Sequence, residues 1–389
     1  MNPKLEQRKF VVPEVIIGYE SSLHVGKYLK QFGAHKAMIV TDKNVAEQIW
    51  FSKIIMAIKE SEVDYTLFDD VTGNPKDFEA MLGAELFLAE NCDSIVAIGG
   101  GSPMDCAKCI GIVATNGGHV LDYIGVDEIR LPGPPLICIP TTAGTSADVS
   151  QFAIITDTHE HVKKAIISKK VVPDLALLDP LPLMTMDSYL TACTGMDALT
   201  HAVEAYVSNA ASPLTDVHAL KAISTLYRAL PSAISPDRTL ETMNEMLLGS
   251  LHAGFAFSNA SLGAVHAFAH SLGGQLDLAH GECNSILLQK IISVNFPYAQ
   301  HKYRKIADII GLDVADASDE EVKTALVSAI SNVRESVNIP EFIILDTPNA
   351  EQLDAMTQSA LDDPCMVTNP KNLTYEEVRE LYVNLFKKQ

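Results

Sequence analysis

Three histidines lie in one apolar stretch, "HAFAHSLGGQLDLAHGE", which spans residues 266–282. Their neighbours are mostly alanine, leucine and glycine, with few charges. A buried imidazole must have its ring nitrogens hydrogen-bonded, because an unsatisfied buried polar group costs free energy. Three such rings close together need a shared reason, and the two that we consider are a metal ion and a proton relay.

Two pairs of residues have the spacing that places both side chains on one face of a helix. Asp197 and His201 lie at i and i+4 in "GMDALTHAVEAY", residues 195–206, and His266 and His270 repeat that spacing. One carboxylate and several neutral imidazoles suit a divalent transition metal such as Fe(II) or Zn(II). Each pair alone could be a surface pair or satisfied core histidines, but both lie in apolar, small-residue helices where unpaired polar groups are costly.

The third histidine of the stretch follows two glycines. We expect the pair Gly273 and Gly274 to interrupt the helix, so that His280, followed by Gly281, returns from the next segment toward the same place. The residues alone leave open which four of the five candidate side chains bind a metal.

A glycine-rich segment in the first half of the chain is suited to an anion. In "AIGGGSPMDCAK", residues 97–108, three glycines and a serine lie between an apolar strand and a helix that starts near Pro103. Glycines let the backbone approach a ligand closely, and the free amides at a helix N-terminus favour negative charge. The segment is therefore a candidate pyrophosphate cradle. It is not the G-x-G-x-x-G fingerprint, and alone it could be a tight turn without a ligand.

A second loop and one carboxylate support the dinucleotide hypothesis. "IPTTAGTSAD", residues 139–148, also follows an apolar strand, and ligands of open α/β sheets bind at the carboxyl edge where both loops lie. Asp42 ends the strand "KAMIVTD", where a carboxylate accepts hydrogen bonds from a ribose diol and repels a 2′-phosphate. This favours NAD over NADP. From its spacing, Asp42 could equally be the cap of the following helix.

Two kinds of pattern divide the chain into two parts. Up to about residue 180, short apolar runs alternate with amphipathic stretches, which is typical of buried parallel strands with crossover helices. From about Pro182 onward helical signals prevail, including capping boxes at 318–321 and 374–377. We predict an α/β dinucleotide-binding domain at 1–183 and an all-α, metal-binding and catalytic domain at 184–389, with a ligand cleft between them. The predicted strands are "KAMIVTD", "SIVAIGGGS", "PLICIPTT", "FAIITD" and "LALLDP".

Composition excludes several classes of function. The chain has 389 residues, 47% of them hydrophobic, and 29 basic against 49 acidic residues give a formal charge of −20. That charge repels nucleic acid and anionic membranes. The N-terminus lacks the pattern of a secretory signal and no apolar run is long enough for a membrane span, so we expect a cytoplasmic protein. Seven scattered cysteines suit a reducing compartment, and the pair Cys106 and Cys109 lies in a helical pattern without a second C-x-x-C.

Six ordered motifs over nearly the whole chain resemble those of the iron-containing, group III alcohol dehydrogenases. They are "GGGSPMDCAK", "PTTAGTSAD", "LLDP", "TGMDALTHAVEAY", "FSNASLGAVHAFAHSLGG" and "HGECNS". The resemblance implies four metal ligands: Asp197, His201, His266 and His280. It makes His270 a second-sphere histidine near the substrate, and it places Phe257 and Cys365 in the substrate pocket. The dinucleotide contacts that it implies are Asp42, Asn74, Gly99, Gly100, Gly101, Ser102, Asp105, Thr141, Thr142, Thr145 and Lys163.

The chain departs from the family pattern in one loop. The family usually has G-T-G-S-E where this chain has "GTSAD", residues 144–148. Ser146 in place of the second glycine is expected to stiffen the loop, and Asp148 shortens the carboxylate by one methylene. The segment "GPPLICIPTTAGTSADVSQFAIITD" also resembles a subgroup described as alcohol-dehydrogenase-like regulatory proteins, which concerns role rather than fold.

The resemblance implies an NAD-linked, metal-dependent alcohol dehydrogenase that interconverts a small primary alcohol and its aldehyde. The expected cofactors are NAD and Fe(2+), with Zn(2+) as the alternative ion. The metal acts as a Lewis acid, the dinucleotide exchanges a hydride, and His270 passes a proton to solvent. The family also implies a homodimer. The rival hypotheses are a ligand-sensing regulatory protein with little turnover, and a metal hydrolase, which leaves the glycine-rich loops and Asp42 without a role.

Overall fold

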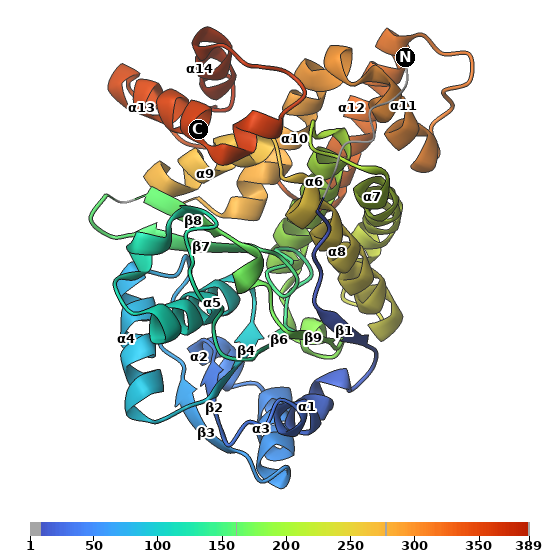
Figure 1. Cartoon of the computed structure of the whole chain (residues 1–389). Helices are drawn as coiled ribbons and strands as arrows, with labels where there is room; N and C mark the ends of the chain where they lie inside the picture. The colour runs from blue at the N-terminus through green and yellow to red at the C-terminus, as the bar shows by residue number, and fades with distance from the viewer. Residues whose placement is uncertain (1–8, 161, 277, 388–389) are drawn as a thin grey trace.

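A parallel sheet forms the centre of the N-terminal half of the protein (Figure 1). The computed structural model describes residues 9–160, 162–276 and 278–387. The sheet has six strands in the order β1-β9-β6-β4-β2-β3, and every neighbouring pair in it is parallel. Its strands are β1 (Glu14–Ile17), β2 (Lys36–Val40), β3 (Asp64–Phe68), β4 (Ser94–Gly99), β6 (Leu136–Pro140) and β9 (Leu175–Leu178).

Alternate residues of the central strands point to opposite faces, and each face is covered by helices. On one face Ile39 of β2 and Ile98 of β4 pack with α1 and α3, whereas on the other Met38 and Ala97 pack with α4 and α5. Burial on both faces explains why these strands are continuous apolar runs. The helices of this half are α1 (Val25–Gln31), α2 (Lys43–Ala46), α3 (Ile49–Glu60), α4 (Asp77–Ala89) and α5 (Gly101–Asn116).

One predicted strand does not belong to the parallel sheet. "FAIITD" forms β7 (Phe152–Asp157), which pairs antiparallel with β8 (Val162–Ile167) in a separate three-stranded sheet completed by β5 (Gly125–Val126). The prediction of a parallel strand was wrong here. The reason is that β7 is buried on one side only: alternate residues are buried, as expected for a strand that packs one face on a helix. In Figure 1, β7 and β8 lie between α5 and α9, where β7 contacts α5 and β8 contacts α9.

The C-terminal half is helical, as predicted. The capping boxes are confirmed, since Ser318 caps α12 and Thr374 caps α14 with the expected glutamates. The glycine pair at 273–274 does not interrupt its helix, because α9 continues through it to Leu276. The helices are α6 (Ser188–Val207), α7 (Pro213–Ala233), α8 (Leu240–Ala260), α9 (Ala264–Leu276), α10 (His280–Asn295), α11 (Gln300–Ile309), α12 (Asp319–Ser336), α13 (Ala350–Asp362) and α14 (Tyr375–Val383). Short 3-10 helices are Ser21–His24, Val120–Tyr123, Lys169–Val171, Pro182–Thr185, Phe296–Tyr298 and Pro364–Thr368.

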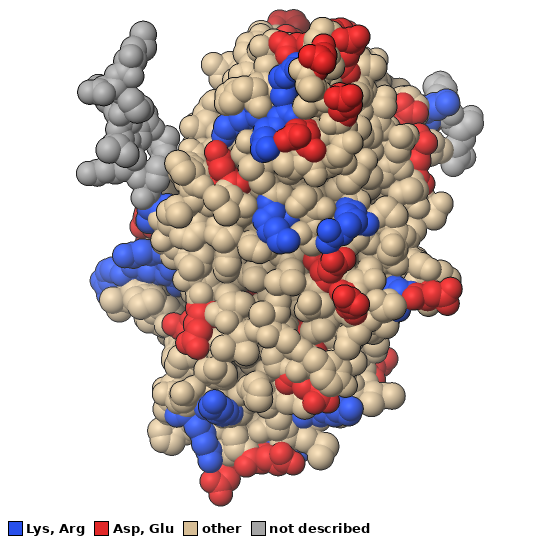
Figure 2. All heavy atoms as spheres, turned by 90° about the vertical axis from the view of Figure 1, so that its right-hand side faces the viewer, with Lys and Arg blue, Asp and Glu red and all other residues tan. Residues whose placement is uncertain are grey.

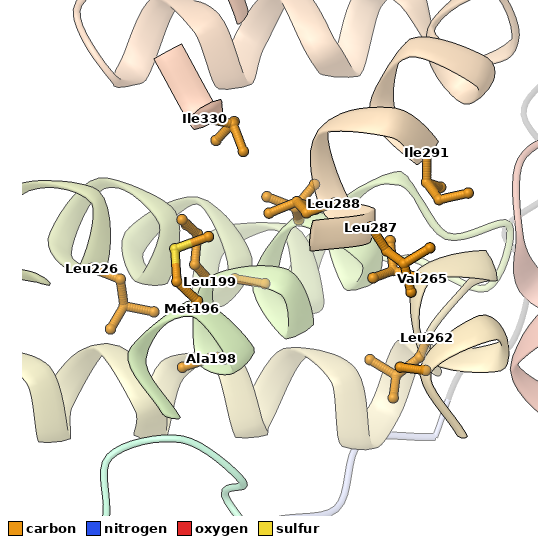
Figure 3. Packing of buried hydrophobic residues seen from close by; sticks show 14 of the residues in the cluster. Met196, Ala198, Leu199, Leu226, Leu262, Val265, Leu287, Leu288, Ile291 and Ile330 are labelled. Atoms are coloured by element: carbon orange, nitrogen blue, oxygen red, sulfur yellow. The ribbon is translucent and has the colours of Figure 1, made fainter. Parts of the chain in front are cut away.

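Helix α6 lies at the centre of this half and is buried along most of its length. Met196 and Leu199 of α6 pack with Leu226 of α7 and Leu288 of α10 in one cluster of buried residues (Figure 3). A helix surrounded by other helices holds its side chains in fixed directions, because close packing leaves few alternative rotamers. Polar residues on α6 are therefore held rigidly.

Charged side chains of both signs are spread over the face of the protein that Figure 2 shows. On the face in Figure 2, lysine and arginine side chains are interspersed with aspartate and glutamate, and no continuous basic stripe crosses that face. None of the helices in the described ranges combines the length and apolar character that a membrane span requires.

Candidate metal and dinucleotide site

Helices α6, α9 and α10 bring one carboxylate and three imidazoles together. Asp197 Oδ1 lies 3.6 Å from His201 Nε2, 3.5 Å from His266 Nε2 and 3.8 Å from His280 Nε2. Ligands around a tetrahedral zinc with bonds of about 2.0–2.1 Å lie about 3.4 Å apart. The spacing and chemistry of these donor atoms therefore fit a divalent transition metal. Among the described residues, Asp197, His201 and His266 form a group in which one donor atom of each lies within 4.8 Å of the others.

The surroundings of the four side chains perturb their ionisation. Burial raises the pKa of Asp197, but the neighbouring histidines outweigh this and hold it far below its usual value. Burial lowers the pKa of His201 to about 4 and that of His280 well below its ordinary value. Burial acts in the same direction on His266, but hydrogen bonds to carboxylates raise its pKa to about 9. Two of the three imidazoles are thus kept neutral, the form that binds metals.

A buried amide contacts three of these side chains. Asn284 Nδ2 donates a hydrogen bond to Asp197 Oδ1 at 2.7 Å and lies 3.2 Å from Nε2 of both His266 and His280. Asn284 is fully buried on α10, one turn after His280. Sequence analysis did not identify this residue, although its i+4 spacing from a candidate ligand was a usable signal.

A second carboxylate contacts the ring nitrogen of His266 that points away from Asp197. Glu204 Oε2 lies 2.6 Å from His266 Nδ1, and both residues are buried. Glu204 was also missed in the sequence. It lies three residues after His201 on the same helix, a spacing that places both on one face.

The fifth candidate lies next to the cluster and has its own carboxylate partner. His270 stacks on His280 with ring centroids 5.3 Å apart, and its Nδ1 lies 2.8 Å from Asp363 Oδ2. Asp363 Oδ1 accepts from the backbone N–H of Cys365 at 2.8 Å. Burial raises the pKa of Asp363, but His270 and these hydrogen bonds lower it to about 2. The pair is half-buried and borders the cavity described below.

The two predicted phosphate-binding loops pack directly against each other. A Cβ built on Gly101 would lie 3.0 Å from the Thr145 side chain, and one on Gly100 would lie 3.2 Å from Thr142. Glycines therefore allow the two loops to approach each other closely, and a larger residue would have to displace a threonine side chain by a few tenths of an ångström. Gly100 is the N-cap of α5, which begins at Gly101, two residues before the predicted start. The free amides of a long helix thus face this junction.

One cavity of about 570 Å³ joins the loops to the histidine cluster. Its wall includes all four candidate ligands, His270 and both predicted substrate-pocket residues. Phe257 stacks on His201 with centroids 4.3 Å apart and lies 5.9 Å from the ring of Phe152. Of the predicted dinucleotide contacts, the wall includes Asn74, Gly101, Ser102, Asp105, Thr145 and Lys163. It does not include Asp42, Gly99, Gly100, Thr141 or Thr142. These residues lie at the same edge of the sheet: Asp42 follows β2, Gly99 and Gly100 are at the end of β4, and the two threonines follow β6.

Asp42 caps a helix. It precedes the four-residue helix α2, and its Oδ1 accepts from the backbone N–H of Val45 at 3.0 Å. This is one of the two alternatives that the sequence left open. The cap uses Oδ1, and the residue is half-buried.

Asp105 and Lys163 are charged residues on the wall of this cavity. Burial raises the pKa of Asp105 to about 6, despite the nearby positive charges of Lys108 and Lys163. Lys163 extends from β8 toward α9, since a Cβ built on Gly273 would lie 3.6 Å from its Nζ. Lys108 is buried and donates to the backbone oxygens of Ser150 and Phe152 at 3.1 and 2.6 Å, which holds the start of β7 against α5.

The loop that departs from the family pattern is fastened to the helical half. Ser146 has a φ of 50°, a left-handed conformation that favours glycine. Its hydroxyl donates to the backbone oxygen of Ser250 in α8 at 2.8 Å. The backbone N–H of Gln151, at the end of the same loop, donates to Ser258 Oγ of α8 at 3.0 Å. The expected stiffening thus has a physical basis in contacts to α8.

Comparison with known proteins agrees with this arrangement. Residues 13–180 match the pattern of the family "Iron-containing alcohol dehydrogenase", and residues 191–386 match "Fe-containing alcohol dehydrogenase family, C-terminal". The chain is 34% identical to an NAD-dependent methanol dehydrogenase of Bacillus methanolicus, over 96% of this chain and 98% of the relative. It is 37% identical to a 1,3-propanediol dehydrogenase of Citrobacter freundii, over 97% and 98% of the two chains.

Solved structures show the same likeness in three dimensions. The crystal structure of a 1,3-propanediol oxidoreductase superposes with a TM-score of 0.95 at 35% identity and covers 98% of this chain and 100% of the other. An alcohol dehydrogenase from Oenococcus oeni has a TM-score of 0.94 at 32% identity, with 97% and 100% covered. With sequence patterns matched in both halves and one shared fold, the chain belongs to the iron-containing alcohol dehydrogenase family.

Proposed function

We propose that this protein is a metal-dependent, NAD-linked alcohol dehydrogenase that interconverts a small primary alcohol and its aldehyde. The observation that carries the proposal is the single cavity that joins the glycine-rich loop to the Asp and His cluster. Hydride transfer requires a nicotinamide and a substrate carbon in close contact, which one continuous cavity permits. The relatives, which include an NAD-dependent methanol dehydrogenase and a 1,3-propanediol dehydrogenase, support the same activity.

Four side chains are proposed as the metal ligands: Asp197, His201, His266 and His280. Their donor atoms converge from α6, α9 and α10. Iron(II) is the ion we propose, and zinc(II) suits the same donors. When bound, the ion supplies Lewis-acid polarisation of the substrate oxygen.

The dinucleotide is proposed to lie along the first half of the cavity. The amides at the start of α5 and the hydroxyls of Ser102 and Thr145 face the place for its phosphates. Lys163 adds positive charge, and Asn74 borders the same wall. Asp42, with one oxygen in the helix cap, is proposed to accept from the ribose with the other, which favours NAD over NADP. The remaining proposed contacts are Gly99, Gly100, Gly101, Asp105, Thr141 and Thr142.

His270 is proposed to carry the proton. Its Nδ1 is held by Asp363, so Nε2 is the nitrogen available to the substrate hydroxyl or to solvent. The substrate chain is proposed to lie against Phe257 and Cys365, both buried and on the cavity wall. These apolar walls exclude water from the reacting carbon and leave little for a charged substituent to bind.

The test is a spectrophotometric scan of the purified, metal-loaded protein. We expect a change in NADH absorbance with short primary alcohols and with their aldehydes, and its abolition by a chelator. The regulatory alternative predicts that ligands bind without turnover. The hydrolase alternative predicts ester cleavage that needs no dinucleotide.

We further propose a homodimer in the cytoplasm with domains at 1–183 and 184–389. The last strand of the parallel sheet ends at Leu178 and the following elements are helical, which supports the boundary. The cysteines among the described residues are all free and buried, as suits a reducing compartment. Light scattering coupled to size exclusion tests the dimer, and limited proteolysis between 178 and 191 tests the boundary.

A further inference from the structure

We propose that Glu204 is a positioning residue of the metal site, which sets the affinity for the metal by fixing both the tautomer of His266 and the start of helix α9. The inference rests on the proposed function, because it assigns His266 as a ligand. It adds a residue that is neither a proposed ligand nor part of the cavity wall.

The carboxylate of Glu204 collects three donors from one segment. Its Oε2 accepts from Gly263 N–H at 3.1 Å and lies 2.6 Å from His266 Nδ1, while Oε1 accepts from Val265 N–H at 2.7 Å. The first amides of a helix have no partner within the helix, and α9 begins at Ala264. Glu204 therefore caps α9 from outside while it holds the ring of a residue in the first turn.

The packing around this carboxylate leaves room for no larger group. Glu204 is 4% exposed and His266 is 1% exposed. A Cβ built on Gly263 would lie 2.9 Å from Glu204 Oε1, so glycine is needed for the carboxylate to reach the backbone. Among the described residues, the ion pairs give Glu204 one partner, His266. A buried carboxylate is costly unless fully hydrogen-bonded, so these three contacts account for its presence.

The contact to Nδ1 selects one form of the imidazole. A carboxylate only accepts, so Nδ1 must carry the proton. In a neutral ring, Nε2 then has the free lone pair, and Nε2 is the atom that lies 3.5 Å from Asp197 Oδ1. A carboxylate behind a metal-binding histidine in this way orients the ring and raises its basicity as a ligand.

The same residue couples two helices. Asp197, His201 and Glu204 lie at i, i+4 and i+7 of α6 and therefore on one face. The first two present ligand atoms, and the third fixes the helix that carries His266 and His270. One side chain thus sets the register of α9 against α6, which determines how closely the donor atoms of the two helices approach.

The experiment compares metal binding by the full-length protein and three variants. Glu204→Gln keeps the size but replaces one acceptor oxygen with an NH2 group, so in either orientation of the amide at least one of the three donors loses its acceptor. Glu204→Asp keeps the charge but withdraws it by one methylene. Asp179→Asn is the matched control, because Asp179 is equally buried and accepts from Ser22 Oγ at 2.6 Å and Leu181 N–H at 3.0 Å, in the other half of the chain.

Zinc affinity is measured by competition with a chromophoric chelator, and folding by thermal unfolding of the metal-free proteins. We expect Glu204→Gln to bind zinc about 10–100-fold more weakly than wild type and Glu204→Asp to fall between them. Asp179→Asn should lose stability but keep its zinc affinity within about threefold, because Asp179 does not bond a proposed metal ligand. Zinc affinity of Glu204→Gln equal to wild type would overturn the inference and leave Glu204 as a helix cap only.

A measurement on the wild-type protein decides the matter if Glu204→Gln does not fold. Nitrogen NMR of the zinc-loaded protein, labelled at histidine, should show His266 with Nδ1 protonated and Nε2 bound to the ion. The reverse assignment would overturn the inference. Failure of the wild type to bind zinc or iron would instead contradict the proposed function, so the two failures are distinguishable.

Discussion

His270 Nδ1 and Asp363 Oδ2 lie 2.8 Å apart although 93 positions separate the two residues in the chain. The histidine comes from α9, whereas the aspartate precedes the 3-10 helix Pro364–Thr368 near the C-terminus. Because the carboxylate accepts from Nδ1–H, the ring can exchange a proton only through Nε2. This pairing gives His270 a defined orientation beside the metal cluster.

We predict that His270→Ala keeps its metal but loses about 100-fold in kcat, because it removes a proton-transfer group. Asp363→Ala should lose about 10-fold, since the ring remains but is no longer oriented. Asp362→Ala is the matched control, because Asp362 is the preceding residue, is exposed, and accepts a hydrogen bond from Gln358 Nε2 within helix α13. Steady-state rates and elemental analysis check the set, and stoichiometric metal loss in His270→Ala would move that residue among the ligands.

Removal of a proposed metal ligand should affect both metal content and activity. We predict that His266→Ala and His280→Ala lose bound metal and activity together, because each removes one of four bonds to the ion. His35→Ala should change neither, since the His35 side chain is 92% exposed and directly precedes β2 in the N-terminal half of the chain. Elemental analysis of the purified variants is the measurement. Full metal occupancy with normal turnover in either cluster variant would show the ligand assignment to be wrong.

The role of Asp42 in cofactor choice can be separated from its role as a helix cap. Asp42→Asn keeps an N-cap of similar strength but removes the negative charge, whereas Asp42→Gly removes the charge and weakens the cap by a few tenths of a kcal/mol. Both variants should shift the ratio of kcat/KM from NAD toward NADP, because the repulsion of the 2′-phosphate is lost. An unchanged ratio in both would mean that Asp42 is a cap only.

Ser146 offers a test of the contact between the two halves. Ser146→Ala keeps the left-handed backbone but loses the hydrogen bond to α8, and should lower the free energy of unfolding by about 1 kcal/mol. Ser146→Gly loses the same bond but relieves backbone strain of about 1 kcal/mol, so it should be nearly neutral. Ser250→Ala is the control, since the main acceptor is the Ser250 backbone oxygen. Urea unfolding checks the order, and a larger loss for Gly than for Ala contradicts it.

Asp148 should make stability depend on pH. Burial raises its pKa to about 6, above the value of about 3.9 in an unfolded chain. The folded protein then binds the proton more tightly, so the stabilising contribution is complete below about pH 4 and lost as the pH rises through about 6. Relative to wild type, Asp148→Asn should gain on the order of 2 kcal/mol in unfolding free energy between pH 4 and pH 8.

Asp157→Asn should show the opposite dependence of the unfolding free energy on pH. The hydrogen bond from Lys164 lowers the pKa of Asp157 to about 2, so its contribution is present above about pH 4 and lost as the pH falls through about 2. This variant should be less stable than wild type at pH 8, with a smaller deficit at pH 3. Parallel pH profiles for the two variants would refute both assignments.

The sequence by itself determined the features that depend on residues close together in the chain. The i, i+4 pairs at 197–201 and 266–270, the capping boxes and the apolar strands depend on neighbours within one or two turns, and the structure has them where they were predicted. The glycine-rich loop was recognisable for the same reason. Local backbone geometry fixes which side chains share a face before any tertiary contact forms.

Tertiary structure decided the contacts between segments far apart in the chain. Asp363 bonds His270 because the C-terminal segment packs on α9. Strand β7 is not part of the parallel sheet because it pairs with β8. Tertiary packing also explains why α9 continues past its two glycines. The free energy gained by burying one face of the helix exceeds the helix-propensity cost of about 1 kcal/mol per glycine. Helix spacing places Glu204 and Asn284 on the same faces as candidate ligands, but their hydrogen-bond partners lie on other helices and are determined only when the three helices meet.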